Sequence, residues 1–152
     1  MTEIGFYHLT RLPLERALPK LLEKVLAAGK RAVVRAGSSE RVAFLNAALW
    51  TYDPASFLPH GTAREGEAAD QPVWLTDRDE NPNGAQVLVL TDGAEAGDPA
   101  RYERCIEMFN GNDPAAVEAA RGRWRAYRDA GFDLAYWQQT ERGGWEKRNG
   151  AG

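Results

Sequence analysis

An uninterrupted apolar segment, Val87-Leu88-Val89-Leu90, restricts the fold of this chain more than any other stretch. Successive side chains of a strand point to opposite faces of its sheet, so a strand without polar residues must be covered on both faces. Such strands are typical of the centre of a parallel sheet, where helices cover both sides. The sequence therefore predicts a strand over residues 86–90 near the middle of a layered α/β domain.

The rest of the chain alternates between strand-like and helix-like segments. Strands are predicted at 4–9, 30–36, 73–75, 86–90 and 104–109, and helices from Leu14 to about Leu26, from Val42 to about Trp50 and from Pro114 to about Ala130. Pro19 lies inside the first helical pattern and predicts a kink or a later helix start. This alternation predicts a three-layer, Rossmann-like α/β fold with a mostly parallel sheet and helices on both faces.

Loop and cap signals divide the predicted elements. Ser38 or Ser39 can cap the second helix, and Asn112 or Asp113 can cap the third, which has Pro114 at its first position and Gly131 at its end. A length of 152 residues fits one domain. We expect a single α/β domain over residues 1–132 and a partly ordered C-terminal tail over residues 133–152, which are polar and interrupted by glycines.

Composition narrows the class of function. The formal net charge is −3, whereas proteins that grip duplex DNA are usually basic. Cys105 is the one cysteine, so an internal disulfide is excluded, as suits a reducing compartment. No apolar run reaches the roughly 20 residues that span a membrane, and the N-terminus lacks the pattern of a signal peptide. We expect a cytoplasmic protein without membrane contact.

One block of positive charge stands out against this acidic background. The segment RGRWRAYRDAGF, residues 121–132, holds four arginines and three aromatic residues. On a helix, Arg121, Trp124, Arg125 and Arg128 share one face, and that stripe contains no acidic residue. The opposite side, which we expect to pack on the sheet, carries small residues and one ring: Ala116, Ala119, Ala120, Tyr127 and Ala130.

Two interpretations of this stripe remain open from the residues themselves. Cations near a helix C-terminus are favoured by the macrodipole, so the stripe could be a solvated surface. Arginine beside an aromatic ring is also enriched at binding sites, and Phe132 adds a second ring beyond the helix end. Such a site suits an acidic peptide that ends in a bulky residue, or a single-stranded nucleic acid stacking on Trp124. The small number of arginines and the acidic net charge favour the peptide.

Four stretches of the sequence carry a resemblance to a known family. They are FYHL at 6–9, the segment from GKRAVVRA to ALWTYDPASFLPHG at 29–61, VLVL at 87–90, and RWRAYRDAGF at 123–132. In this order they resemble the chi subunit family of bacterial DNA polymerase III, accessory proteins of the clamp loader. The pattern from Ala48 to His60 is the most specific of the four.

The resemblance implies a Rossmann-like fold without a nucleotide site, and an adaptor rather than an enzyme. It implies that one surface binds the C-terminal tail of single-stranded DNA-binding protein (SSB), which is acidic and ends in Ile-Pro-Phe. Another surface would bind the psi subunit or another component of the clamp loader or polymerase. The positions that match the family's SSB-tail motif are Arg121, Trp124, Arg125, Gly131 and Phe132, to which the helical stripe adds Arg128. Where the family often has Tyr and Lys, this chain has Trp124 and Arg125, which keep an aromatic ring and a positive charge at these positions.

Trp50, Phe57 and Pro59 match the family signature near the psi-binding surface. They are also consistent with a purely structural role in the core or in anchoring a loop. The resemblance therefore implies a second interface here, while the residue types leave both interpretations open.

Other chemistry is poorly supported by the sequence. Gly37-Ser38-Ser39 could hold a phosphate, but neither a Walker lysine nor a GxGxxG pattern accompanies it. His8 and His60 lack neighbours at metal-ligand spacing, and Cys105 in a strand is typical of a small buried residue. We expect no cofactor, no metal and no catalytic residues. The alternative function is a nucleotide- or single-stranded nucleic-acid-binding module on the same fold.

Overall fold

A computed structural model describes residues 2–53, 58–64 and 66–148. The strands are β1 (Glu3–Leu9), β2 (Ala32–Arg35), β3 (Gly61–Thr62), β4 (Val73–Thr76), β5 (Val87–Leu90), β6 (Arg104–Asn110), β7 (Asp133–Gln139) and β8 (Trp145–Arg148). The helices are α1 (Leu14–Ala27), α2 (Ser39–Thr51) and α3 (Pro114–Asp129), with short 3-10 turns at Ala68–Asp70 and Pro99–Arg101.

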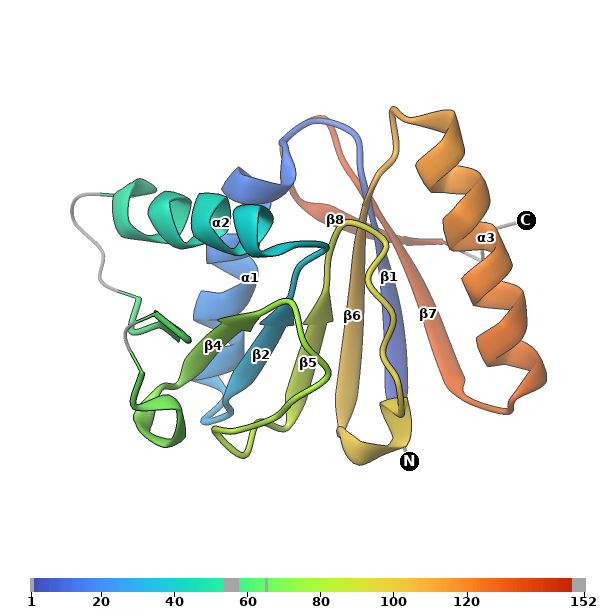
Figure 1. Cartoon of the computed structure of the whole chain (residues 1–152). Coiled ribbons are helices and arrows are strands. Elements are labelled where there is room, and N and C mark those ends of the chain that lie inside the picture. Colours follow the sequence, from blue (N-terminus) through green and yellow to red (C-terminus); the bar gives the residue numbers. More distant parts are fainter. Residues whose placement is uncertain (1, 54–57, 65, 149–152) are drawn as a thin grey trace.

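The strands form one mixed sheet in the order β3-β4-β2-β5-β6-β1-β7-β8. Within the described residues every neighbouring pair is parallel except β7 and β8, which are antiparallel. Helices α1 and α2 cover one face and α3 covers the other (Figure 1). This confirms the predicted α/β class with a mostly parallel sheet and helices on both faces.

Strand β5 occupies the inner position that its apolar run predicts. It pairs with β2 on one side and with β6 on the other, and all four of its residues are buried. Val87 and Val89 pack into the core beneath α1 and α2, whereas Leu88 and Leu90 pack into the core on the α3 face. Burial on both sides explains why this strand carries no polar position.

The predicted helix caps agree with the structure. Ser38 accepts a hydrogen bond from the backbone N–H of Arg41 at 3.2 Å, and Asp113 accepts one from Ala115 at 3.0 Å. Helix α1 starts at Leu14, so the possibility of a start beyond Pro19 is excluded. Pro19 lies on the buried face of α1, where apolar packing offsets the missing backbone donor.

The segment after α3 continues the sheet. Strand β7 pairs with β1 in parallel register, from Glu3 opposite Asp133 to His8 opposite Gln138, and β8 pairs with β7. The expected boundary after residue 132 thus lies between α3 and β7. Beyond it, residues 133–148 add two strands to the same sheet that residues 3–110 form. We did not predict these strands, because polar residues and glycines dominate the segment while its pairing partner β1 is about 130 positions away.

Candidate functional site

Helix α3 presents the cationic block, and it packs on β6 and β7 on one face of the sheet. Asp113 at its N-cap and Pro114 at its first position fix where the helix begins. The helix ends at Asp129, and Gly131 just beyond it has a φ of +88°, which is readily adopted only by glycine. These local signals place residues 121, 124, 125 and 128 two to four turns into a regular helix.

The sheet-facing side of α3 differs from the prediction. Val117, Ala120, Trp124 and Tyr127 pack against the core on that face, whereas Ala119 and Ala130 are exposed. The indole of Trp124 is half-buried, with its ring centroid 5.3 Å from Phe6 and 5.8 Å from Tyr136. Trp124 therefore lies at the border between the buried side and the arginine stripe, rather than in the middle of an exposed face.

The three arginines of the stripe remain accessible. The side chains of Arg121, Arg125 and Arg128 are 49%, 54% and 60% exposed. Glu118, which the sequence interpretation overlooked, lies 4.0 Å from Arg121 and 3.9 Å from Arg125, and Asp129 lies 3.4 Å from Arg128. Exposed pairs of this kind contribute roughly 0–1 kcal/mol, so an anionic ligand can compete for these guanidinium groups.

Phe132 marks the far end of the candidate site. Its backbone N–H donates to the carbonyl of Tyr127 at 3.2 Å, and its ring stands edge-on to the Tyr127 ring at 6.0 Å. Tyr127 in turn contacts Phe6, which contacts Trp124. One continuous aromatic cluster thus joins Trp124 to Phe132 along the buried side of α3.

The fourth arginine of the block has a different role. The Nε of Arg123 donates to both carboxylate oxygens of Glu107, at 2.7 and 2.9 Å. The side chain of Glu107 is only 2% exposed and that of Arg123 is 19% exposed. Burial raises the pKa of Glu107, while the Arg123 guanidinium opposes the shift. This pair ties α3 to the middle of β6, and its signal in the sequence is a lone acid within the apolar segment CIEMF.

His8 lies on the α3 face at the end of β1, beside Arg121 and Tyr136. Its Nδ1 shares a short hydrogen bond with the Tyr136 hydroxyl, and its ring lies directly against the backbone of Gly111, where a Cβ would overlap it. Burial lowers the pKa of His8, and the nearby Arg121 charge adds to this, while a backbone hydrogen bond with Gly111 acts in the opposite sense. Sequence reasoning missed this neighbour of the stripe because strand and helix meet only in the folded chain.

The second predicted interface lies at the end of α2. Trp50 is 54% exposed, and its ring centroid lies 4.5 Å from that of His60. His60 is buried, with Nδ1 at 2.7 Å from the carbonyl oxygen of Leu58, and Pro59 between them is half-buried. Phe57 falls outside the described residues. The structure thus brings Trp50 close to the loop that carries Pro59, on the opposite side of the sheet from α3.

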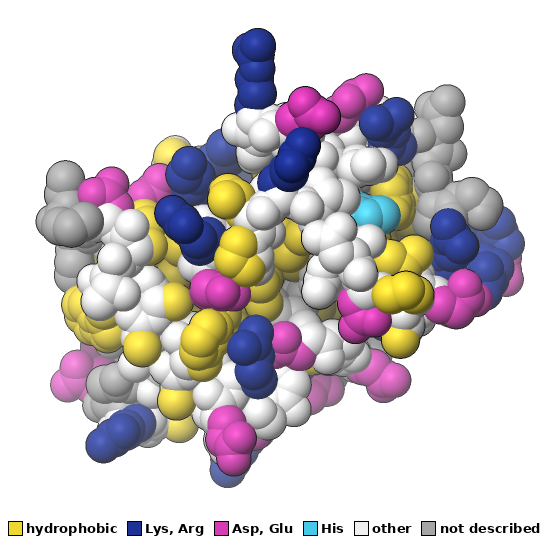
Figure 2. All heavy atoms as spheres, turned by 90° about the horizontal axis from the view of Figure 1, so that it is seen from above, with side chains coloured by type: hydrophobic (Ala, Val, Ile, Leu, Met, Phe, Trp, Pro, Cys, Tyr) yellow, Lys and Arg dark blue, Asp and Glu magenta, His cyan; other side chains and the backbone are white. Residues whose placement is uncertain are grey.

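A cavity of about 760 Å³ opens at the carboxyl ends of the strands. Strands β1 and β6 are neighbours there, but β1 leads into α1 on one face and β6 into α3 on the other. Viewed onto this edge, hydrophobic side chains line a central hollow, and charged side chains surround it (Figure 2). Crevices at such a reversal of connectivity are where α/β proteins usually bind ligands.

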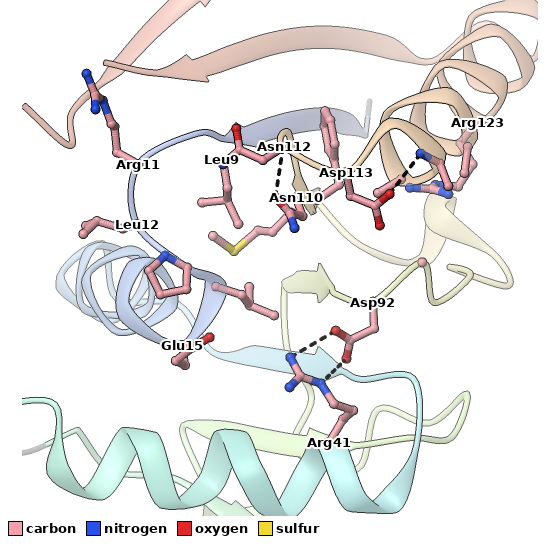
Figure 3. A pocket seen from close by; sticks show the side chains of 18 residues that line it. Leu9, Arg11, Leu12, Glu15, Arg41, Asp92, Asn110, Asn112, Asp113 and Arg123 are labelled. Carbon is pink, nitrogen blue, oxygen red and sulfur yellow. Dashed lines mark hydrogen bonds and ion pairs between the residues drawn. The ribbon is translucent and has the colours of Figure 1, made fainter. Parts of the chain in front are cut away.

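The arginines around this cavity are already paired with carboxylates. Arg41 and Asp92 form an ion pair at one side of it, with two N–O distances of 3.2 Å (Figure 3). Arg123, which also lines it, is bound to Glu107, and Glu15 and Asp113 add negative charge to the rim. The cavity has the size of a small-molecule site, but its balanced charge is poorly suited to phosphate.

Cys105 is buried in β6, and burial raises the pKa of its thiol to about 12. A thiol of this kind is overwhelmingly protonated at neutral pH, and the thiolate is the reactive form. We expect a thiol reagent to label the native protein far more slowly than the protein in denaturant, as measured by mass spectrometry over time. Equally fast labelling in both conditions would contradict a purely structural role.

In the part of the chain that the structure describes, no helix combines the length and the apolar character needed to cross a bilayer. Within the same residues, His, Cys, Asp and Glu side chains form no group of three or more that could hold a metal ion.

Comparison with known proteins agrees with the features above. The model of the family described as "DNA polymerase III chi subunit, HolC" matches residues 1–135. The chain is 29% identical over 109 residues to the probable DNA polymerase III subunit chi of Rickettsia prowazekii, a match that covers 72% of this chain and 66% of that protein, just under two thirds of its length.

Two further relatives carry the same name. The chain is 27% identical over 106 residues to the DNA polymerase III subunit chi of Escherichia coli, covering 70% of this chain and 72% of the relative. It is 26% identical over 137 residues to that of Pseudomonas aeruginosa, covering 88% and 94%. With the family model spanning residues 1–135 of 152, the chain belongs to the DNA polymerase III chi subunit family of DNA replication proteins.

Proposed function

We propose that this chain is a non-catalytic adaptor of the DNA polymerase III holoenzyme. In this proposal α3 binds the acidic C-terminal tail of SSB, and a second surface joins the chain to the psi subunit or another clamp-loader component. The observation that carries the proposal is the position of Arg121, Arg125 and Arg128, which stay half-exposed beside the half-buried indole of Trp124.

The chemistry of α3 matches that of the tail. The tail offers acidic side chains and a terminal carboxylate. Helix α3 offers three guanidinium groups, each able to form bidentate hydrogen bonds with a carboxylate. The terminal phenylalanine would lie against Trp124 and Phe132, at the accessible border of the aromatic cluster. The existing contacts of Arg121 and Arg125 with Glu118 are long and exposed. Breaking them to bind the peptide should therefore cost little free energy.

The second interface in this proposal lies around Trp50, Pro59 and Phe57. Trp50 is among the most exposed large hydrophobic residues of the described chain, at the end of α2. Exposed tryptophans are enriched at energetic hot spots of protein interfaces. This surface lies across the sheet from α3, so both partners could bind at once, as an adaptor requires.

The competing function is a nucleotide- or single-stranded nucleic-acid-binding module, and the cavity at the strand ends is the observation that favours it. Its arginines are paired with acids, which weakens the case for phosphate. Tryptophan fluorescence in the presence of single-stranded DNA alone distinguishes the two functions, because the adaptor should bind the tail peptide and ignore the DNA.

The test of tail binding is a calorimetric titration with a short acidic peptide that ends in Ile-Pro-Phe. We expect micromolar affinity, about −8 kcal/mol. Arg125→Ala should weaken binding at least about tenfold, because hydrogen bonds to charged groups contribute roughly 1.5–3 kcal/mol. Deleting the terminal phenylalanine of the peptide should abolish binding.

The matched control is Arg16→Ala, which removes the same charge from an exposed position on α1, across the sheet. It should bind the peptide as the wild type does. If Arg125→Ala also binds with unchanged affinity, the stripe on α3 is not the tail site.

A further inference from the structure

His8 belongs to no part of the function proposed so far, yet it lies beside the tail site. It is one of two histidines in the chain and faces α3 from the carboxyl end of β1. Its ring centroid lies 5.8 Å from that of Tyr136, and the Tyr136 ring lies 5.8 Å from that of Trp124. The Tyr136 ring therefore lies between the imidazole of His8 and the indole of the proposed site.

Arg121 connects His8 electrostatically to the stripe. Burial lowers the pKa of His8 and raises that of Tyr136, and the Arg121 charge has a smaller, lowering effect on both pKa values. The guanidinium of Arg121 is thus close enough to act on both rings. Side chains from three elements thus gather at one end of the site: Arg121 on α3, His8 on β1 and Tyr136 on β7.

The imidazole is held in place but is not sealed off. The Tyr136 hydroxyl holds its Nδ1, and Gly111 fits so closely that only a glycine leaves room for the ring. The side chain is half-buried, so part of it remains exposed to solvent. A group in this position can take up a proton without leaving its place.

The charges that face His8 favour a negative ligand. Of the charged and titratable groups packed against it, Arg121 approaches from α3 and Tyr136 from β7, while Gly111 contributes its backbone. Among the described residues, no acidic side chain is a cause of the shift in its pKa. A carboxylate bound at Arg121 would supply the missing negative charge and favour the imidazolium.

We propose that His8 and Arg121 form the end of the tail site that receives a carboxylate of the bound peptide, that the buried Tyr136 hydroxyl holds the imidazole in place, and that His8 takes up a proton as the peptide binds. The inference rests on the function proposed above. It makes the affinity for SSB tails sensitive to pH: binding strengthens as pH falls through the histidine range and weakens as pH rises through the value at which bound His8 loses its proton.

The experiment measures peptide affinity by calorimetry at about pH 5.5 and about pH 7.5, where the arginines and the peptide carboxylates keep their charges. Wild-type protein should bind roughly fivefold more tightly at the lower pH, the change that a rise of about one unit in the pKa of His8 on binding gives across this interval. Repeating the titration in buffers of different ionisation enthalpy should show proton uptake.

His8→Gln is the matched variant, because glutamine can still accept a hydrogen bond from Tyr136 but does not titrate. Its affinity should be nearly equal at the two pH values. His60→Gln, which removes the other histidine on the far side of the sheet, should keep the wild-type ratio. In case His8→Gln fails to fold, NMR titration of the wild-type imidazole signals replaces it, and the His8 pKa should rise when the peptide is added.

The outcomes separate this inference from the function on which it rests. If the wild type does not bind the peptide at either pH, the proposed tail binding itself fails. If it binds in an Arg125-dependent way but equally at both pH values, or if His8→Gln retains the full ratio, the role of His8 is overturned while tail binding stands.

Discussion

Replacing Arg123 by methionine is expected to lower the free energy of unfolding by about 3–5 kcal/mol. The substitution keeps a long apolar stem but leaves the carboxylate of Glu107, which is 2% exposed, without its cationic partner. An unpaired buried charge costs far more than the pair contributes, because the low-polarity interior does not replace the lost hydration. Urea denaturation at neutral pH, followed by circular dichroism, measures the change.

The pH dependence of this variant has a defined sign. Burial already raises the pKa of Glu107, and loss of the opposing guanidinium should raise it further. A carboxyl with a folded-state pKa above its unfolded value favours the folded state below the unfolded pKa, and this advantage is lost as pH rises through the folded pKa. The deficit of Arg123→Met should therefore be largest at neutral pH and should shrink in mildly acidic buffer.

Two controls make the result specific. Arg121→Met on the same helix removes a half-exposed charge whose contact with Glu118 is 4.0 Å long, and it should cost less than about 1 kcal/mol. The double variant Glu107→Leu with Arg123→Met replaces both charges by apolar side chains and should recover most of the stability. If Arg123→Met were as stable as Arg121→Met, the buried pair would not anchor α3.

The second large effect concerns binding: Arg121→Glu combined with Arg125→Glu should weaken the tail-peptide interaction by more than about a hundredfold. Two interactions of roughly 1.5–3 kcal/mol each are lost, and two repulsive carboxylates are added. Both side chains are about half-exposed, so the free energy of unfolding should change little. Calorimetric titration at moderate salt, together with a thermal melt, measures both quantities.

The matched control for this pair places the same charge change on the other side of the sheet. Arg16→Glu with Lys20→Glu reverses two exposed cations on α1 and alters the net charge equally. It should leave peptide affinity within about twofold of the wild type, because exposed charges further apart than a Debye length, about 8 Å at physiological salt, are largely screened. Equal losses in both double variants would mean that net charge, rather than the α3 stripe, governs the interaction.

Much of the fold follows from local sequence signals. The apolar run from Val87 to Leu90 predicts an inner strand, and β5 pairs on both sides. The pairs Ser38-Ser39 and Asn112-Asp113 predict the starts of α2 and α3, and Ser38 and Asp113 are the caps, because a cap depends only on residues two or three positions away. Strands β7 and β8 were missed because their stability comes from pairing with a distant strand, which no local pattern encodes.

In the candidate site, too, some features follow from local sequence and others arise only in the folded chain. The density of arginines and rings in residues 121–132, and the end of the helix at Gly131, can be recognised in the sequence, since both depend on residues within a few turns of one helix. The sequence alone does not tell which arginine points inward. Arg123 pairs with Glu107 and Trp124 packs on Phe6 because the sheet sets the rotation of α3 about its axis.

The placement of His8 beside Arg121 is likewise a property of the folded chain alone, because two segments more than a hundred residues apart meet there. Composition and periodicity thus determined that this is a layered α/β domain with one cationic helix. The contacts between β1, β6, β7 and α3 decided which of its charges are buried, which are accessible and which titratable group stands next to them, since these depend on distances that arise only when the sheet closes.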